Sequence, residues 1–151
     1  MAFRLFIAGP WADREQVQVV GRTLTEAGYI ITSRWLSEHT DIPDDTPDRE
    51  ELLLKQAMDD IEDVANADGF VYCNFRMSEG KATELGLALA WGKPILLIGP
   101  RTCNGPGTGN IYLKMPFAQV DNVDEAVVYL NEQLRLAKAA MLEGEHAAVQ
   151  N

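Results

Sequence analysis

Short apolar runs of β-type residues alternate along this sequence with longer segments of helical pattern, and this alternation restricts the fold more than any other feature. The runs are almost continuously apolar, so strands built from them would be buried on both faces. Buried strands connected through helices are typical of a parallel sheet with helices on both of its sides. The expected strands are residues 3–8, 29–32, 69–73, 95–98 and 118–120.

The segments between these runs carry the apolar spacing and the end signals of helices. Gly28 and Gly92 are the expected ends of two of them, and Asp121 or Asn122 is the expected cap of the last. The expected helices are residues 13–28, 46–67, 80–91 and a segment after 122. The sequence therefore predicts an α/β fold, a flavodoxin-like three-layer sandwich with a five-stranded, mainly parallel sheet in the order 2-1-3-4-5.

The length of 151 residues fits one domain, which we expect to span residues 1–142, with a flexible tail over 143–151. A net charge of −10 argues against binding to a nucleic acid polymer, which requires a basic surface. The same charge still permits a small anionic ligand, because backbone N–H groups at a helix N-terminus can hold one phosphate.

The sequence has two cysteines, Cys73 and Cys103, without the spacing of a disulfide framework or a zinc site. A reducing, cytoplasmic location is the expectation, and neither a metal nor another cofactor is expected. The first ten residues read as a strand and not as a signal peptide. No apolar stretch approaches the length that spans a membrane.

The second expected helix begins at a capping hydroxyl, Thr46, followed by Pro47 at the first helical position. Asp60 does not fit its polar face, because it shares a helical column with apolar residues three and four positions away. The predicted buried stripe is Leu54, Ala57, Met58, Ile61, Val64 and Ala65, and the predicted solvent face is Lys55, Gln56, Asp59, Glu62 and Asp63.

In a parallel sheet, ligands bind beyond the carboxyl ends of the strands. This places Glu84, in the first turns of the third helix, near the expected site. Glu84 can also be read as a partner of the helix dipole, Asp60 as a surface acid, and Ser78 as an N-cap. Trp35 fits packing as well as base stacking. The loops that meet at this edge are residues 9–13, 33–47, 74–80 and 99–110.

Other chemistries have weaker support in the sequence. His39 and His146 lie in a loop and in the tail, and no nucleophile elbow or Walker-type phosphate loop is present. The glycine-rich residues 105–109 match a phosphate loop in composition only. Two carboxylates suffice for glycosyl transfer, since one can attack the anomeric carbon while the other assists the leaving group.

Three segments resemble the nucleoside 2-deoxyribosyltransferases and the related 2′-deoxynucleoside 5′-monophosphate N-hydrolases. They are Leu5-Phe6-Ile7-Ala8-Gly9-Pro10, the helix with Asp60-Ile61, and Ser78-x-Gly80-x-x-x-Glu84-Leu85-Gly86-x-Ala88. The resemblance extends over roughly residues 3 to 120 in order and spacing. It implies that Glu84 is a catalytic nucleophile that forms a covalent deoxyribosyl intermediate. It implies that Asp60 orients Glu84 or assists the leaving base.

The resemblance also implies a nucleoside or nucleotide pocket. Ser78 and Gly80 match the Ser-x-Gly of the monophosphate hydrolases and favour a 5′-phosphate, whereas the charge of Glu79 disfavours one. Phe6 stands where family members often carry tyrosine. Arg14 and Arg101 are candidate phosphate partners. The expected substrate-binding residues are Phe6, Gly9, Pro10, Trp11, Asp13, Ser78, Gly80 and Asn110.

Family members commonly form homodimers or larger homo-oligomers, so the resemblance implies self-association, with the segment from Asn110 to Met115 as a candidate contribution to a neighbouring pocket. Two alternatives remain open at this point. One is a glycohydrolase acting on NAD or ADP-ribose, and the other is a nucleotide-binding module without catalysis on the same fold.

Overall fold

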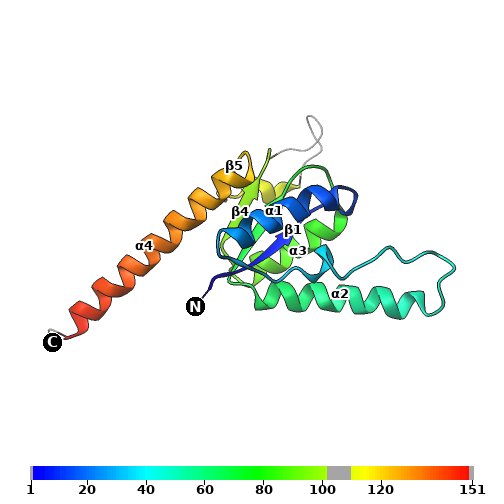
Figure 1. The fold of residues 1–151 in the computed structure, drawn as a ribbon, viewed down its shortest axis with the longest axis horizontal. Helices are drawn as coiled ribbons and strands as arrows, with labels where there is room; N and C mark the ends of the chain where they lie inside the picture. Colours follow the sequence, from blue (N-terminus) through cyan, green and yellow to red (C-terminus); the bar gives the residue numbers. More distant parts are fainter. Residues whose placement is uncertain (1, 102–109, 150–151) are drawn as a thin grey trace.

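The computed structural model describes residues 2–101 and 110–149, without the side chains of residue 138 and residues 141–149. Its five-stranded sheet is entirely parallel and has the order β2-β1-β3-β4-β5 (Figure 1), which confirms the predicted flavodoxin-like topology. The strands are β1 (Arg4–Ala8), β2 (Ile30–Ile31), β3 (Gly69–Cys73), β4 (Ile95–Ile98) and β5 (Ala118–Val120). Cys103 and the glycine-rich segment 105–109 lie outside the described residues.

The α-helices form the outer layers of the sandwich. Helix α1 contacts α4, and α2 contacts α3, so each pair covers one face of the sheet (Figure 1). The four helices are α1 (Arg14–Glu26), α2 (Arg49–Asn66), α3 (Glu79–Ala90) and α4 (Val123–Val149), and the 3₁₀ helices are η1 (Trp11–Asp13), η2 (Arg34–Leu36) and η3 (Ile111–Lys114). Helix α4 continues to Val149. The flexible tail expected for residues 143–151 is not tested by this and stays a prediction.

The core lies between the strands and the helices, and the register of β1 and β3 orders it. Phe6 is opposite Phe70 in the parallel pair, and their rings stack with centroids 5.5 Å apart. Where β1 ends, α1 passes so close to Gly9 that a Cβ there would lie 2.5 Å from Val17. Glycine at position 9 therefore allows the first helix to pack directly against the carboxyl end of the central strand.

Gly28, Gly92 and Asn122 end or cap helices as the sequence predicts, whereas the start of α2 differs. Asn122 caps α4, since its side-chain oxygen accepts from the backbone N–H of Glu125 at 3.0 Å. Gly92 follows α3 with a positive φ of 63°. The predicted start of α2 at Thr46-Pro47 is wrong, because the chain takes a left-handed turn at Asp48, with φ 59°, and the helix begins at Arg49.

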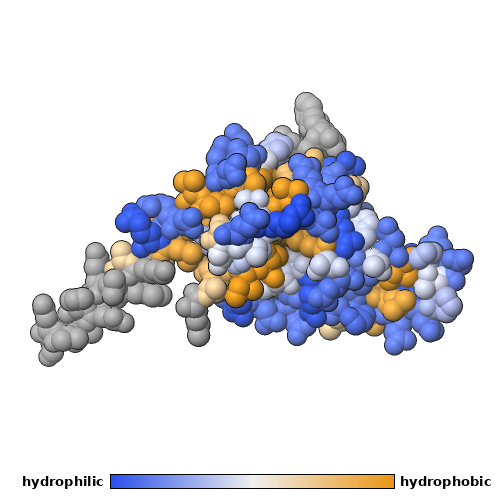
Figure 2. All heavy atoms as spheres, viewed as in Figure 1, coloured by the Kyte–Doolittle hydropathy of each residue, from blue (hydrophilic) through white to orange (hydrophobic). Residues whose placement is uncertain are grey.

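The predicted faces of α2 are also wrong. Among the apolar residues that the pattern assigned to the core, Val64 is buried, whereas Leu54, Met58 and Ile61 are exposed. Asp63, assigned to solvent, is only 5% exposed. The N-terminal half of α2 extends past the sheet (Figure 1), and Figure 2 shows apolar side chains on the surface at that end of the molecule.

Arg34 of η2 explains why acidic side chains of α2 turn inward. Its backbone N–H and its Nε each donate to the Asp63 carboxylate at 2.8 Å. Its guanidinium also pairs with Asp59 at 3.2 Å and with the exposed Glu62 at 2.6 Å. These ion pairs connect the loop after β2 to α2 and fix the rotation of the helix, so electrostatic pairing outweighs the apolar pattern.

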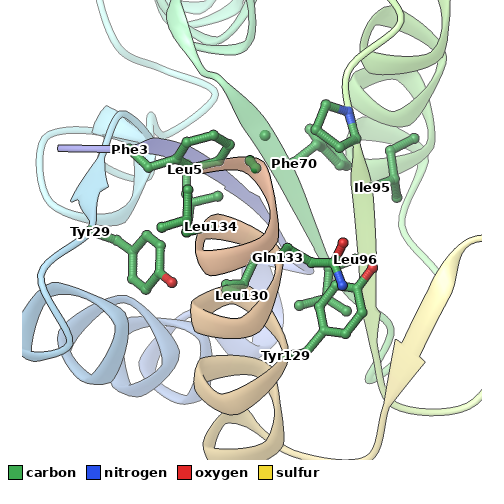
Figure 3. Close-up of a pocket in the computed structure, with 13 residues that line it drawn as sticks. Phe3, Leu5, Tyr29, Phe70, Ile95, Leu96, Tyr129, Leu130, Gln133 and Leu134 are labelled. Atoms are coloured by element: carbon green, nitrogen blue, oxygen red, sulfur yellow. The ribbon is translucent and has the colours of Figure 1, made fainter. Parts of the chain in front are cut away.

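A cavity of about 280 Å³ lies at the amino ends of the strands. Figure 3 shows that side chains of α4, including Tyr129 and Leu134, face Phe3, Leu5 and Phe70 across it. The described side chains that line it are mainly apolar, and none of them is a carboxylate. Within the described residues, no helix has the length and apolarity needed to cross a membrane.

Replacing Asp63 with alanine should destabilise the protein far more than replacing Glu62. Asp63→Ala removes the acceptor of the part-buried backbone N–H of Arg34 and of its Nε, which costs about 3 kcal/mol of unfolding free energy. Glu62→Ala removes an exposed partner of the same Arg34 and should cost less than about 1 kcal/mol. Urea denaturation of both variants measures the difference, and equal losses would contradict the assignment of Arg34 and Asp63 as the connection between η2 and α2.

Candidate functional site

A cavity of about 270 Å³ lies at the carboxyl ends of the strands, where the topology predicted a site. It is bounded by the residues that follow β1, by the loop after β2, by α2 and by the start of α3. The residues that line it are Gly9, Trp11, Trp35, His39, Leu53, Gln56, Ala57, Asp60, Ser78, Gly80, Lys81 and Glu84. The structure therefore brings together Glu84 and Asp60, which come from different helices 24 positions apart in the sequence.

Glu84 projects into the cavity from the second turn of α3. Its Oε2 is buried, and within the described part of the chain it has no hydrogen-bond partner. Burial raises the pKa of Glu84 well above the usual value of 4.5, and the charge of Asp60 raises it further, while the charge of Lys81 lowers it. The position near the helix N-terminus therefore does not by itself keep this carboxyl group ionised.

Asp60 enters the same cavity from the middle of α2. Its Oδ1 is buried and also lacks a hydrogen-bond partner among the described residues. Burial raises the pKa of Asp60 to about 7, with further contributions from the charges of Asp63 and Asp59, against the opposing charge of Arg34. The sequence predicted that Asp60 does not belong to the solvent face of its helix. The structure agrees, since Asp60 lines the cavity.

The charged neighbours of the two acids differ. Acidic neighbours on α2 surround Asp60, whereas the charge on its own helix that acts on Glu84 is the cation Lys81. Burial is the largest cause of the raised pKa of both groups, and the charge of Lys81 favours ionisation of Glu84 against it.

His39, in the loop before α2, is a third titratable group in the cavity. It is 6% exposed, with Nδ1 3.9 Å from Asp60 Oδ1 and Nε2 3.8 Å from Asp59 Oδ2. Burial lowers the pKa of His39 despite these acidic neighbours, so the neutral imidazole is favoured near pH 7. A neutral imidazole can exchange hydrogen bonds with Asp60 without adding charge to the cavity.

Two tryptophans form an aromatic wall of the cavity. Trp35 is buried, and its indole N–H donates to the carbonyl oxygen of Ile7 at 2.8 Å. Trp11 is 39% exposed, with its ring 6.3 Å from that of Trp35 and the Arg14 guanidinium 4.5 Å from its own centre. Trp35 is thus anchored by packing, while Trp11 presents an accessible ring on which a planar ligand could stack.

The start of α3 forms the polar side of the cavity. Ser78 occupies the N-cap position of the helix, but its hydroxyl makes no capping hydrogen bond, so this side chain does not serve as the cap. A Cβ added to Gly80 would meet nothing within 4 Å, so the backbone there is open to close approach by a ligand. The buried Lys81 follows, and its ammonium group donates to Asn74 Oδ1 at 2.9 Å.

Four of the predicted substrate-binding residues do not line this cavity. Phe6 is fully buried in the core and Pro10 is buried beneath the first loop. Asp13 pairs with Arg76 at 2.6 Å and borders a neighbouring depression that includes Trp11. The Asn110 side chain accepts from the N–H of Tyr112 at 3.0 Å at the start of η3. Their roles in binding stay predictions.

The two arginines considered as phosphate partners already have contacts. Arg14 donates to the carbonyl oxygen of Leu36 at 3.2 Å besides its stacking on Trp11. The guanidinium of Arg101 donates to carbonyl oxygens of Leu113 at 2.9 Å and Met115 at 2.8 Å, which holds η3 in place. Arg101 therefore has a structural function in this fold.

Sequence reasoning set His39 aside and did not single out Lys81. His39 follows an aperiodic loop, so no spacing connects it to Asp60 before the fold is known. Lys81 carried a detectable signal, since it precedes Glu84 by three positions and therefore shares its helix face. Within the described ranges, no group of three or more histidine, cysteine or acidic side chains has the arrangement of a metal site.

No family model matches this sequence, and no curated protein matches it. Solved structures do match the fold. A conserved protein from Enterococcus faecalis V583 has a TM-score of 0.64 and 15% identity, with 88% of this chain and 99% of that chain covered.

Two matching structures are a 2-deoxyribosyltransferase, a type named in the sequence analysis, and an N-glycosidase named for a ribonucleotide, CMP. The 2-deoxyribosyltransferase of Bacillus psychrosaccharolyticus has a TM-score of 0.58 and 19% identity, covering 82% of this chain and 90% of its own. The CMP N-glycosidase BcmB of Clostridium botulinum has a TM-score of 0.53 and 18% identity, covering 85% and 98%. DNA processing protein A of Helicobacter pylori matches too, at 12% identity, so likeness of fold alone does not select a function.

Replacing Asp60 with asparagine should stabilise the folded protein at alkaline pH. The folded-state pKa of Asp60, about 7, exceeds the usual 3.8, so the unfolded chain releases this proton first as the pH rises. Stability is therefore lost between about pH 4 and 7, and it stays lost above that range. After allowance for solvent screening, Asp60→Asn should gain about 1 to 2 kcal/mol at pH 8 and nothing at pH 3.5.

Thermal denaturation of the wild type and Asp60→Asn across this pH range measures the effect. Asp124→Asn on the exposed start of α4 is a matched control and should change stability equally little at both pH values. A destabilised Asp60→Asn protein at pH 8 would contradict a buried, unpartnered carboxylate at this position.

Proposed function

We propose that this chain cleaves or transfers the N-glycosidic bond of 2′-deoxynucleosides or their 5′-monophosphates through a covalent intermediate on Glu84. The observation that carries the proposal is the pair of buried carboxyl groups in one cavity, each with an oxygen that has no partner among the described residues. The enzymes named in two of the matching structures support the same class of reaction.

In the first half of the proposed reaction, the ionised Glu84 attacks C1′ of the deoxyribose. A C–O bond to the carboxylate forms as the C1′–N bond to the base breaks. Asp60, with its pKa of about 7, donates its proton to the departing base nitrogen. A neutral base and a glycosyl ester on Glu84 result, and the negative charge passes from Glu84 to Asp60.

In the second half, water or the nitrogen of another base attacks C1′ from the opposite side. Asp60 accepts the proton of the attacking group, and the ester bond to Glu84 breaks to restore its carboxylate. Two displacements retain the configuration at C1′. Hydrolysis and transfer thus differ only in the acceptor that enters the cavity.

The walls of the cavity suit a nucleoside. The ring of Trp11 offers a stacking surface for a base. At the start of α3, the backbone of Gly80 and the Ser78 hydroxyl provide donors for a 5′-hydroxyl or a 5′-phosphate, and the helix N-terminus favours an anion. The nearby Glu79 opposes a phosphate through its charge.

Glu84→Gln should lower kcat by on the order of 10³-fold or more, because an amide cannot form the ester at C1′. Glu132→Gln, an exposed acid on α4, is the control and should retain wild-type turnover. Release of free base from a deoxynucleoside and from its monophosphate, followed by chromatography, measures both variants.

A 2′-fluoro-substituted nucleoside should trap the intermediate, because fluorine destabilises the oxocarbenium-like transition state and slows turnover of the ester. Mass spectrometry of the peptide that contains Glu84 should detect the added fluorinated sugar. Ordinary turnover by Glu84→Gln, or an adduct on another residue, would contradict the proposed mechanism.

We further propose that the chain self-associates through the exposed apolar face of α2, formed by Leu54, Met58 and Ile61. These side chains are 62%, 56% and 39% exposed, and they follow one another at helical spacing. Contiguous apolar surface of this kind is typical of contacts between proteins.

Met58→Glu should convert the oligomer to a single copy, as measured by light scattering after size exclusion, because it places a charge in the contact. Val128→Glu makes the same kind of change at an exposed position of α4 and should leave the measured mass unchanged. A wild-type protein with the mass of a single copy would exclude the contact.

A further inference from the structure

Lys81 is a lysine with almost no solvent exposure, at 2%, in the first turn of α3. Its ammonium group donates to the carbonyl oxygen of Cys73 at 3.4 Å, to Asn74 Oδ1 at 2.9 Å and to the carbonyl oxygen of Arg76. It also lies 4.6 Å from the centre of the Tyr72 ring. These partners belong to β3 and the loop that follows it, so Lys81 joins this loop to the helix that carries Glu84.

Lys81 also belongs to the cavity that holds Glu84. Lys81 and Glu84 are three positions apart on α3 and both line the cavity. Burial and the charge of Asp60 oppose ionisation of Glu84, and Lys81 favours it. A buried cation is costly unless its surroundings compensate for lost hydration. The carbonyl and amide oxygens around Lys81 provide that compensation and keep its positive charge beside the cavity.

We propose that Lys81 is a positioning residue for Glu84: it supplies the positive charge that allows the buried Glu84 carboxylate to ionise, and it holds the loop after β3 against α3. The inference rests on the proposed function only where Glu84 is named as the nucleophile. The effect of the Lys81 charge on the ionisation of Glu84 is inferred from their spacing on α3 and from the cavity that both residues line. It can be measured without turnover.

A purely structural role is the competing explanation, and Lys93 provides the control for it. Lys93 Nζ donates to the carbonyl oxygens of Ala65 at 2.8 Å and Ala67 at 2.6 Å. It joins two segments as Lys81 does, but it lies beyond the C-terminal end of α3, away from the cavity. Loss of Lys93 should weaken the fold without changing the ionisation of Glu84.

Other titratable groups face Glu84 and contribute to any pH profile. Asp60 faces it from α2, and His39 lines the cavity from the preceding loop. Cys73 on β3 contacts Lys81 through its backbone, and burial raises the pKa of its thiol to about 12, so it stays neutral across the working range. The test therefore compares variants at position 81 with the wild type, in which these groups are the same.

The first experiment measures the pH profile of kcat/KM for the wild type, Lys81→Met, Lys81→Arg and Lys93→Met. In Lys81→Met the acid limb should move up by about one pH unit or more, which is a loss of about tenfold on that limb. Lys81→Arg keeps the charge and should return the limb toward its wild-type position. Lys93→Met should lower the melting temperature and leave the limb in place.

An unmoved limb in a folded Lys81→Met protein would overturn the proposal, as would an equal displacement in Lys93→Met. A wild type with no glycosidic activity would refute the proposed function but leave the charge relation open to the second experiment.

The second experiment uses nuclear magnetic resonance of carboxyl-labelled glutamate and amine-labelled lysine. In the wild type, the Lys81 ammonium resonance should shift over the same pH range as the Glu84 carboxyl resonance. The Glu84 titration should move to higher pH in Lys81→Met. Independent titration of the two groups in the wild type would overturn the proposal, even where Lys81→Met fails to fold.

Discussion

Two half-buried carboxyl groups that line one cavity repel each other when both are ionised, and the proposed chemistry depends on how the fold resolves that conflict. Asp60 lies on a helix face with Asp59 and Asp63, whereas Glu84 lies on a helix face with Lys81. The two groups thus have different charged neighbours, and the proposed mechanism uses Asp60 as the acid and Glu84 as the nucleophile. Retaining glycosyl transfer requires this division of roles.

The same requirement explains the unusual orientation of α2. A helix that presents acids to the interior needs cations there, and Arg34 provides one through its contacts with Asp63 and Asp59. The helix is then held by ion pairs instead of by an apolar stripe, so Leu54 and Met58 remain exposed. The inward position of Asp63 and the exposure of Leu54 and Met58 therefore have the same cause, which is the ion pairing of α2 with Arg34.

The sequence predicted the fold well where one local pattern determined the structure. Buried parallel strands read as apolar runs, and the predicted β3, Gly69–Cys73, coincides with the observed strand. Apolar periodicity failed for α2, because the partner that fixes its rotation, Arg34, is up to 29 positions away and contributes charge. A spacing rule cannot include a side chain from another segment.

The sequence likewise predicted some residues of the candidate site and missed others. Topology and resemblance pointed to Glu84 and Asp60, since strand ends converge at one edge of the sheet. His39 became a candidate only through its neighbour in space, Asp60, whereas the spacing of Lys81 from Glu84 on α3 is visible in the sequence. No spacing rule connects His39 to Asp60, because the two residues lie in different segments.

The proposed reaction breaks a glycosidic bond to 2′-deoxyribose with the paired acids. Its most direct test is incubation of the purified protein with 2′-deoxynucleosides, their 5′-monophosphates, the corresponding ribonucleotides and NAD, with and without a second free base. The account predicts release of free base from deoxyribosyl substrates, and a new nucleoside or nucleotide where the added base is the acceptor. Release of nicotinamide from NAD without cleavage of any deoxyribosyl substrate, or stabilising binding of nucleotides without any product, would contradict it.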